Sequence, residues 1–160
     1  MNNQILDIIT IGGVIQSAVA PVFLITGVAS LLGVLSNRLA RAMERARNLE
    51  FAIPNTEDSS LKKAQFNELD YLWTRISVLN KSYTLCSLCA LLLCFVIVLL
   101  FVSHIFAINL STSIAMVFIA AMLSLIIGLI MSLREVFIAT KALRARFKER
   151  NIDKEMILKE

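Results

Sequence analysis

The sequence predicts an all-α, polytopic membrane protein with three transmembrane helices and a cytoplasmic helical hairpin between the first and the second. Two uncharged blocks of 30 and 52 residues, at positions 8–37 and 82–133, exceed the roughly 20 residues that a helix needs to cross the hydrocarbon core. All 16 Lys and Arg residues lie outside them, eight in the stretch 38–81 and eight in 134–159. A hydrophobic content of 58% is also too high for an ordinary soluble domain of 160 residues.

The first uncharged block predicts one span at 14–35 after a short outer segment, 1–13. The sequence Ala18-Val19-Ala20 is similar to a signal-peptide cleavage site, but no positive residue precedes the apolar run and Pro21 follows the site directly. We therefore expect a retained membrane helix. Because proline removes a backbone donor, we also expect a kink or a helix restart at Pro21, with residues 8–20 as a separate helix in the outer interface.

The second uncharged block predicts two spans, at 82–102 and 110–133, joined by an outer turn at 103–109. A single helix of 52 residues would be about 78 Å long, which no bilayer accommodates. Cationic segments remain in the cytoplasm. We therefore expect a multi-pass protein of the bacterial inner membrane with its N-terminus outside and its C-terminus in the cytoplasm.

The segment 36–81 between the first two spans keeps a helical period although it is polar, which predicts a coiled-coil-like hairpin. Its two apolar faces break at 54–60, where turn formers and acidic residues are placed to cap the next helix. The faces follow heptad spacing: Leu35, Leu39, Ala42, Ala46, Leu49 and Ile53 before the turn, and Leu69, Leu72, Ile76, Leu79 and Tyr83 after it.

The last segment, 134–160, predicts a cytoplasmic helix to about Arg150 and a frayed tail at 151–160. Leu133, Phe137, Thr140 and Phe147 lie broadly on one side of it. It suits either an interfacial helix on the inner leaflet or a third helix against the hairpin.

A basic stripe follows the first span, with Arg38, Arg41 and Arg45 on one helical face and Arg47 beside it. Its simplest role is contact with anionic membrane lipids, which also accounts for the net charge of +4 without nucleic acid. The fixed spacing also suits an anionic ligand, or acidic groups such as Glu68 and Asp70 on the returning helix.

Small and mildly polar residues line two of the spans, and we expect them either to pack helices or to line a pore. Small residues at a spacing of four let helix backbones approach closely. A conducting path usually carries an ionisable residue within the span, and none lies at bilayer depth here. The residues are Gln16, Ala20, Gly27, Ser30 and Asn37 in the first span, and Ala120, Ser124, Gly128 and Ser132 in the third.

The sequence predicts no enzyme, no cofactor and no metal site. Cys86 and Cys89 form a CxxC, but they fall inside a membrane span, where buried packing is expected instead of redox chemistry. His104 is the single histidine and has no second ligand near it in the sequence. No phosphate-binding glycine loop and no nucleophile with a base is present.

The segment 16–47 resembles a bacterial inner-membrane family catalogued as domain of unknown function 2721. Ala20-Pro21, followed by the residues at 37–41 and 44–47, carries most of the resemblance, with Glu44 where the family pattern has Asp. The stretches 72–80 and 132–136 are also similar to the family. The resemblance covers about residues 16–140 and implies a three-helix bacterial membrane protein without implying an activity.

Two functions remain open from the sequence. The first is a non-catalytic, homo-oligomeric scaffold or accessory factor whose hairpin and basic stripe contact lipid or a cytoplasmic protein partner. The second is a homo-oligomeric ion-conducting pore lined by the polar face of the first span and gated near Arg38.

Overall fold

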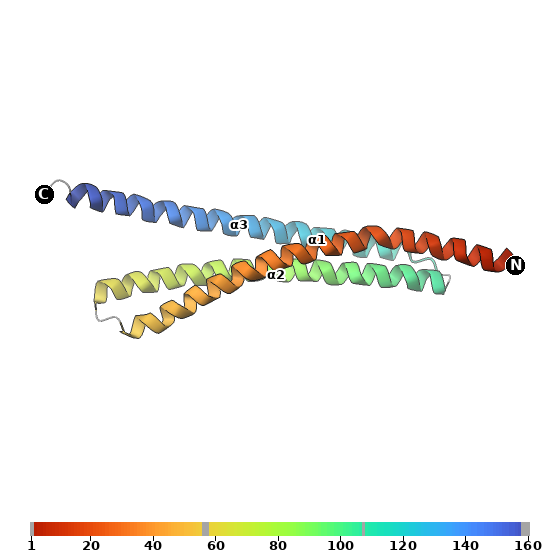
Figure 1. Ribbon diagram of the computed structural model, residues 1–160, viewed down its shortest axis with the longest axis horizontal. Helices are drawn as coiled ribbons and strands as arrows, with labels where there is room; N and C mark the ends of the chain where they lie inside the picture. Colours follow the sequence, from red (N-terminus) through yellow and green to blue (C-terminus); the bar gives the residue numbers. More distant parts are fainter. Residues whose placement is uncertain (1, 56–57, 107, 158–160) are drawn as a thin grey trace. The chain divides into compact units, whose positions relative to one another are not determined.

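The protein is built from three long α-helices in the part of the chain that the structure describes. A computed structural model describes the backbone of residues 2–55, 58–106 and 108–157, and the side chains of residues 12, 13, 15–55, 58–106 and 108–137. The helices are α1 (Asn2–Ala52), α2 (Ser59–Ile105) and α3 (Ser111–Ile157), with a 3-10 turn, η1 (Ile53–Asn55), after the first (Figure 1). Each contains a stretch long and apolar enough to cross a membrane, which confirms the predicted all-α class and its three membrane-length helices.

The helices contribute to two compact units. The apolar unit consists of Met1–Ser36 and Ser82–Leu129, and the basic unit consists of Asn37–Lys81 and Ile130–Glu160. All 16 Lys and Arg residues belong to the basic unit, whereas Asp7 is the single acidic residue of the apolar unit. The division of the fold therefore coincides with the division of charge along the sequence.

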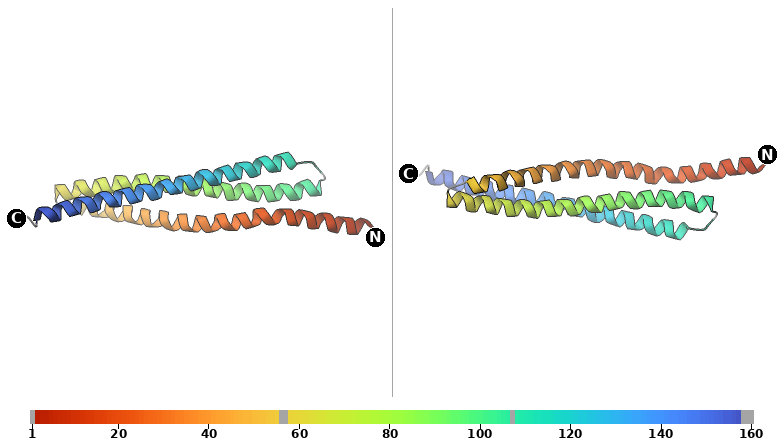
Figure 2. Two further views of the ribbon diagram at one scale, coloured as in Figure 1. Left: turned by 90° about the horizontal axis from the view of Figure 1, so that it is seen from above. Right: turned by 90° about the horizontal axis from the view of Figure 1, so that it is seen from below.

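The apolar unit has a small core of fully buried side chains. Val28 of α1, Cys89 and Leu93 of α2 and Ala121 of α3 form it, so that all three helices meet there. In this unit α2 and α3 run side by side in opposite directions from the turn that joins them (Figure 2). Large apolar side chains such as Phe23 remain exposed around the core, as is expected of a surface in contact with lipid.

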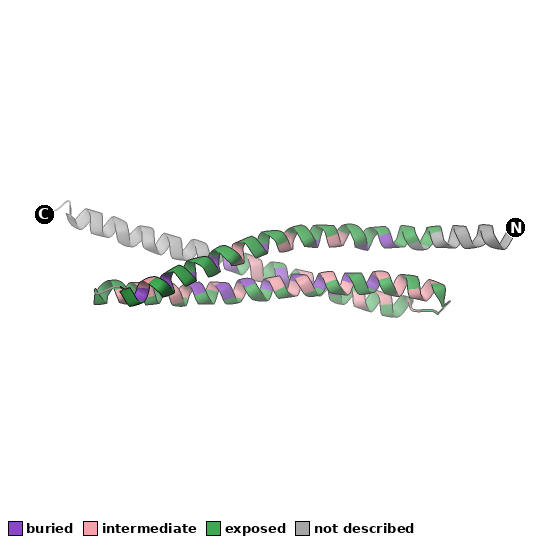
Figure 3. Cartoon of the chain, turned by 60° about the horizontal axis from the view of Figure 1, so that its bottom comes forward, coloured by how far each residue is buried: buried purple, intermediate pink, exposed green. Residues whose placement is uncertain are grey.

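The basic unit buries residues that recur along α1 and α2 with heptad spacing. Figure 3 shows buried positions as separate bands along these two helices, with exposed residues between them. The two apolar faces predicted from the sequence therefore point inward. Their buried members in this unit are Ala42, Ala46, Leu49, Ile53, Leu72, Ile76 and Leu79.

Side chains cap the helices that follow the two turns. Asp58 precedes α2, and its Oδ1 accepts hydrogen bonds from the backbone N–H and the hydroxyl of Ser60, both at 2.8 Å. The first of these bonds satisfies a backbone donor that the first turn of a helix leaves unpaired. Asn109 has the same role before α3, where its Oδ1 accepts from the N–H of Ser111 at 3.4 Å. The predicted acidic cap of the second helix is thus Asp58.

Two features differ from the sequence predictions. Helix α1 continues through Pro21, so the separate helix predicted at 8–20 is not present. A proline costs one backbone hydrogen bond, but in an apolar environment a full helix break would leave several polar groups unpaired. Helix α3 continues to Ile157, so its backbone does not fray after Arg150 as predicted. The side chains of Thr140 and Phe147, assigned to the apolar side of this helix, lie outside the described residues.

Candidate functional site

Three arginines of the basic stripe line a cavity of about 190 Å³ in the basic unit. Arg38, Arg41 and Arg45 reach it from one face of α1, because positions i, i+3 and i+7 lie above one another on a helix. Arg75 approaches from α2, and this residue was not among the predicted site residues. Ala42 and Leu72 complete the lining, and the small Ala42 side chain leaves room between the two helices. We call this cavity the arginine pocket.

Glu135 of α3 holds two of the four arginines of the pocket. Its side chain is 0% exposed, and its Oε1 accepts a hydrogen bond from Nε of Arg75. Its Oε2 lies 3.2 Å from Nη2 of Arg38 as an ion pair, but it accepts no hydrogen bond within the described residues. Two guanidinium groups thus compensate for burying one carboxylate, and they connect α3 to both other helices.

A second and more exposed ion pair lies between Arg45 and Glu68. The Nε and Nη2 atoms of Arg45 both contact Oε1 of Glu68, at 3.3 and 3.0 Å. The side chains are 59% and 20% exposed, so water screens this pair far more than it screens Glu135. Glu68 was one of the two acidic partners suggested by the sequence. The other, Asp70, forms no ion pair within the described ranges.

The remaining two arginines of the predicted stripe differ in position. Arg41 lines the arginine pocket but forms no ion pair with any side chain that the structure describes. Arg47 lies away from the pocket and lines a separate hollow with Ala40, Met43 and Glu44. The structure therefore brings together three of the four predicted arginines and separates the fourth from them.

The small residues of the third span pack against α2 of the same chain. The hydroxyl of Ser124 donates to the carbonyl oxygen of Leu85 at 2.8 Å, and that of Ser82 donates to the carbonyl oxygen of Gly128 at 2.6 Å. A Cβ atom at Gly128 would lie 3.0 Å from Sγ of Cys86, so only glycine fits without displacement. These positions are therefore contacts within one chain, whereas Ala120 is exposed and Ser132 half-buried.

The polar face predicted on the first span is exposed. Gln16, Gly27, Ser30 and Asn37 are all exposed, and a Cβ atom at Gly27 would meet nothing within 4 Å. The hydroxyl of Ser30 donates to the carbonyl oxygen of Thr26 at 3.2 Å, one turn back along the same helix. This face therefore packs against neither α2 nor α3.

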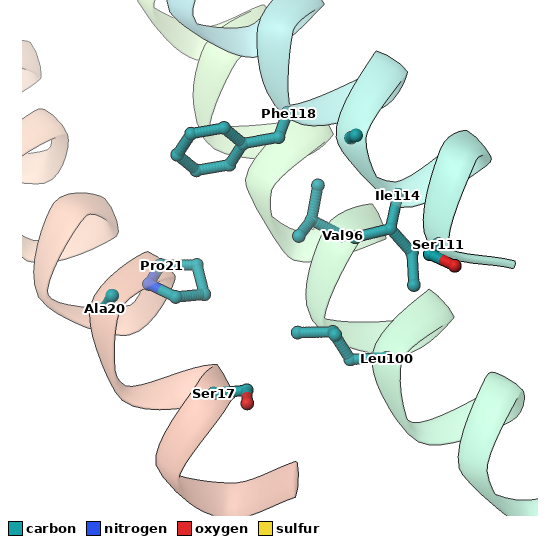
Figure 4. Close-up of a pocket in the computed structure, with 9 residues that line it drawn as sticks. Ser17, Ala20, Pro21, Val96, Leu100, Ser111, Ile114 and Phe118 are labelled. Atoms are coloured by element: carbon teal, nitrogen blue, oxygen red, sulfur yellow. The ribbon is translucent and has the colours of Figure 1, made fainter.

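Ala20, the fifth residue of that face, borders an apolar cavity of about 390 Å³ in the apolar unit. Figure 4 shows Ser17, Ala20 and Pro21 of α1 on one side and Val96 of α2 with Phe118 of α3 on the other. The proline ring points across the cavity toward α2 (Figure 4). Residues of all three helices thus line this cavity.

The comparisons with known proteins identify the family. The family model described as Protein of unknown function (DUF2721) matches residues 18–145. The chain belongs to this family. No curated protein and no solved structure matches the chain significantly.

Two residues of the site, Arg75 and Glu135, were not predicted from the sequence. Both lie in the part of the chain that matches the DUF2721 model. The resemblance to the family already drew on the stretches that contain them, without a role for either residue. A signal was available for Glu135, because it is the first carboxylate after the uncharged block 82–133. It lies as close to the end of that block as Arg38 lies to the end of the first block, to within one residue. A buried charge next to a membrane span requires a partner of opposite sign.

Proposed function

We propose that this DUF2721 protein is a non-catalytic scaffold or accessory factor of the bacterial inner membrane. It assembles into a homo-oligomer and uses the basic unit to contact anionic lipid or a cytoplasmic protein partner. The observation that carries this proposal is the coincidence of fold and charge: every Lys and Arg belongs to the unit that contains the arginine pocket. Such a unit at a membrane surface attracts anionic headgroups, at about 1 kcal/mol per basic residue close to the surface.

The chemistry of the arginine pocket supports binding over catalysis. Guanidinium groups stay protonated at all physiological pH values, so they bind anions but do not exchange protons as general acids or bases do. Among the described side chains, Glu135 is the carboxylate that reaches two of them, and it is fully buried and engaged with both. The four arginines of the pocket therefore suit recognition of a negative group.

The proposed orientation places the N-terminus outside and the basic unit in the cytoplasm, as the positive charges favour. Fusions of a reporter that is active only outside the cytoplasm test this. We expect no activity for a fusion after Glu160 or one at Asn55, because both belong to the basic unit. A fusion in the turn between α2 and α3, at Ile108, should be active. Activity after Glu160 would reverse the orientation.

The exposed face of the first span supports the proposed assembly. A Cβ atom at Gly27 would meet nothing within 4 Å beyond its own helix, so we expect a larger side chain there to change association without disturbing the fold. We expect mass measurement in native nanodiscs to show an oligomer, and Gly27→Leu to shift its distribution toward smaller species. Gly33→Leu is the matched control. A Cβ atom there also meets nothing within 4 Å, but Gly33 does not belong to the polar face, so the oligomer distribution should not change. A monomer of 17.8 kDa as the single species would reject assembly.

A second candidate, an ion-conducting pore, is favoured by the exposure of Gln16, Ser30 and Asn37, which a central water path would need. The arginine proposed as its gate is less suitable, because the charge of Arg38 is partly neutralised by Glu135. Planar-bilayer recording of verified oligomers distinguishes the two candidates. The scaffold predicts no conductance, whereas a pore predicts channel events whose anion preference falls in Arg38→Gln and Arg41→Gln.

A further inference from the structure

The arginine pocket contains more positive charge than its surroundings neutralise. Four guanidinium groups line it, and the carboxylates in ion pairs with them are those of Glu68 and Glu135 within the described side chains. Among the side chains that the structure describes, two of the four positive charges therefore have no counter-ion. Arginines this close together repel one another, so a bound anion would stabilise their arrangement.

Several N–H donors of the pocket also remain available. Within the described side chains, Arg75 uses Nε for Glu135 and keeps both of its Nη groups, and Arg45 uses Nε and Nη2 for Glu68 and keeps Nη1. Arg41 makes no ion pair with a described side chain, so none of these side chains occupies its planar group. Planar guanidinium groups bind the oxygens of phosphate in pairs, with charge-assisted hydrogen bonds.

The size of the pocket limits the group that it can hold. A volume of about 190 Å³ is below the 300–1,000 Å³ typical of sites that enclose a drug-sized molecule. It exceeds by more than tenfold the roughly 10–15 Å³ that a single water requires. A small tetrahedral anion with a few waters fits these limits, whereas a whole nucleotide does not.

Glu135 keeps the pocket in position without filling it. Its buried carboxylate fixes Arg38 and Arg75 from the side of α3, so these two side chains are ordered before a ligand arrives. Its Oε2 accepts no hydrogen bond within the described residues. Preordered donors lower the entropic cost of binding an anion.

We propose that the arginine pocket binds a phosphate group, held by Arg41 and by the free donors of Arg45 and Arg75. The inference rests on the proposed contact role of the basic unit and adds the chemical class of the ligand. Arg38 directly follows the uncharged block, and Arg45 lies about 10 Å farther along the helix. The headgroup region is about 5–8 Å thick on each side of the hydrocarbon. The phosphate therefore comes either from a lipid headgroup or from free phosphate in the cytoplasm.

Direct binding to the purified full-length protein in an uncharged detergent tests the proposal. Equilibrium dialysis with radiolabelled inorganic phosphate measures the free ion, and native mass spectrometry counts adducts of phosphatidic acid. Oleic acid serves as the comparison lipid, because it carries a negative charge without a phosphate. We expect binding of at least one phosphate source at one site per chain, and weaker binding of oleic acid.

Three substitutions locate the site, and Arg41→Gln and Arg47→Gln form the matched pair. Arg41→Gln should weaken phosphate binding about tenfold or more, as expected for the loss of charge-assisted hydrogen bonds. Arg47→Gln removes the same charge from the same helix but lies at a separate hollow, so binding should change less than about twofold. Arg41→Lys keeps the charge without the planar group and should be intermediate. Circular dichroism should show an unchanged helix content in all three, because neither arginine forms an ion pair with a described side chain.

Each outcome decides the proposal. Phosphate binding that depends on Arg41 but not on Arg47 supports it. The source is free phosphate if inorganic phosphate binds and phosphatidic acid does not, and a lipid if the reverse is found. The proposal is overturned if neither source binds, if both Gln variants weaken binding equally, or if oleic acid binds as tightly with the same dependence. The masses of the same samples report assembly separately, so a monomer that binds phosphate rejects the oligomer and retains the pocket.

Discussion

Helix α3 contacts α2 in both units, but through opposite kinds of residue. In the apolar unit Ser124 and Gly128 bring the two backbones close enough for hydroxyl-to-carbonyl hydrogen bonds. In the basic unit Glu135 reaches Arg75 through a buried ion pair. The same pair of helices is thus joined by small neutral groups in the apolar unit and by charged groups in the basic unit.

The difference follows from the solvent that each unit is suited to. Between helices in lipid the hydrophobic effect gives no net attraction, so close packing and interhelical hydrogen bonds must hold them together. In contact with water, apolar faces associate on their own, and the buried residues of α1 and α2 supply them in the basic unit. Ion pairs then add a fixed register between helices.

The largest expected effect tests the charged contact. Glu135→Gln leaves Arg38 and Arg75 without their shared counter-ion, and breaking a buried ion pair of this kind costs about 3–5 kcal/mol. Glu68→Gln makes the same chemical change at an exposed pair and should cost at most about 1 kcal/mol. Thermal unfolding of both variants in detergent, followed by circular dichroism, measures the difference. Equal destabilisation would show that Glu135 does not hold the basic unit together.

The next effect tests the close approach in the apolar unit. Gly128→Ala places a Cβ atom 3.0 Å from Sγ of Cys86 and 3.3 Å from Cβ of Leu85. Overpacking of this kind costs about 1–3 kcal/mol. Gly33→Ala, where the new methyl group meets nothing within 4 Å, should be neutral or slightly stabilising. If the two variants unfold at the same temperature, α2 and α3 are not held together by close approach at Gly128.

Patterns along single helices made the fold predictable. Uncharged runs and heptad spacing depend on neighbours in the sequence, so the three helices, the inward faces with Leu72 and Ile76, and the cap at Asp58 follow from them. The continuity of α1 through Pro21 did not follow, because the local rule for proline ignores the cost of unpaired backbone groups in an apolar environment.

Partners between helices were harder to predict than faces. Arg38, Arg41 and Arg45 could be placed on one face from spacing alone, but the acidic group that Arg38 meets comes from α3, almost 100 residues later. The same holds for Gly128, whose small size was visible in the sequence but whose contact with Cys86 was not. Spacing defines which residues share a face, and the packing of helices defines what that face meets.

A smaller effect tests the hydrogen bonds of the apolar unit. Ser82→Ala removes the donor to the carbonyl oxygen of Gly128, and interhelical bonds of this kind in membranes average about 0.6 kcal/mol and reach about 1.7 kcal/mol. Ser30→Ala is the control, since its hydroxyl bonds to Thr26 of its own helix and joins no second helix. The unfolding temperatures of these two variants in detergent should differ by less than those of Gly128→Ala and Gly33→Ala. A larger effect of Ser30→Ala would place the stabilising contact on the exposed face of α1.

The smallest effect compares the caps of the two turns. In the basic unit the cap of α2 is a carboxylate, and the hydrogen bonds from Ser60 hold the pKa of Asp58 below its usual value of 3.8. In the apolar unit the cap of α3 is the neutral amide of Asn109. Because the folded state lowers the pKa of Asp58, its contribution is present above about pH 4 and is lost as the pH falls through the folded pKa.

Amide hydrogen exchange at the starts of both helices, measured from neutral to acidic pH, follows this loss. After correction for intrinsic exchange, protection at the start of α2 should fall below about pH 4, whereas that at the start of α3 should not change. In Asp58→Asn the side chain still accepts a hydrogen bond but no longer titrates, so the pH dependence at α2 should disappear while the cap remains. A loss of protection at α2 that persists in Asp58→Asn would assign the acid sensitivity to another carboxylate of the basic unit.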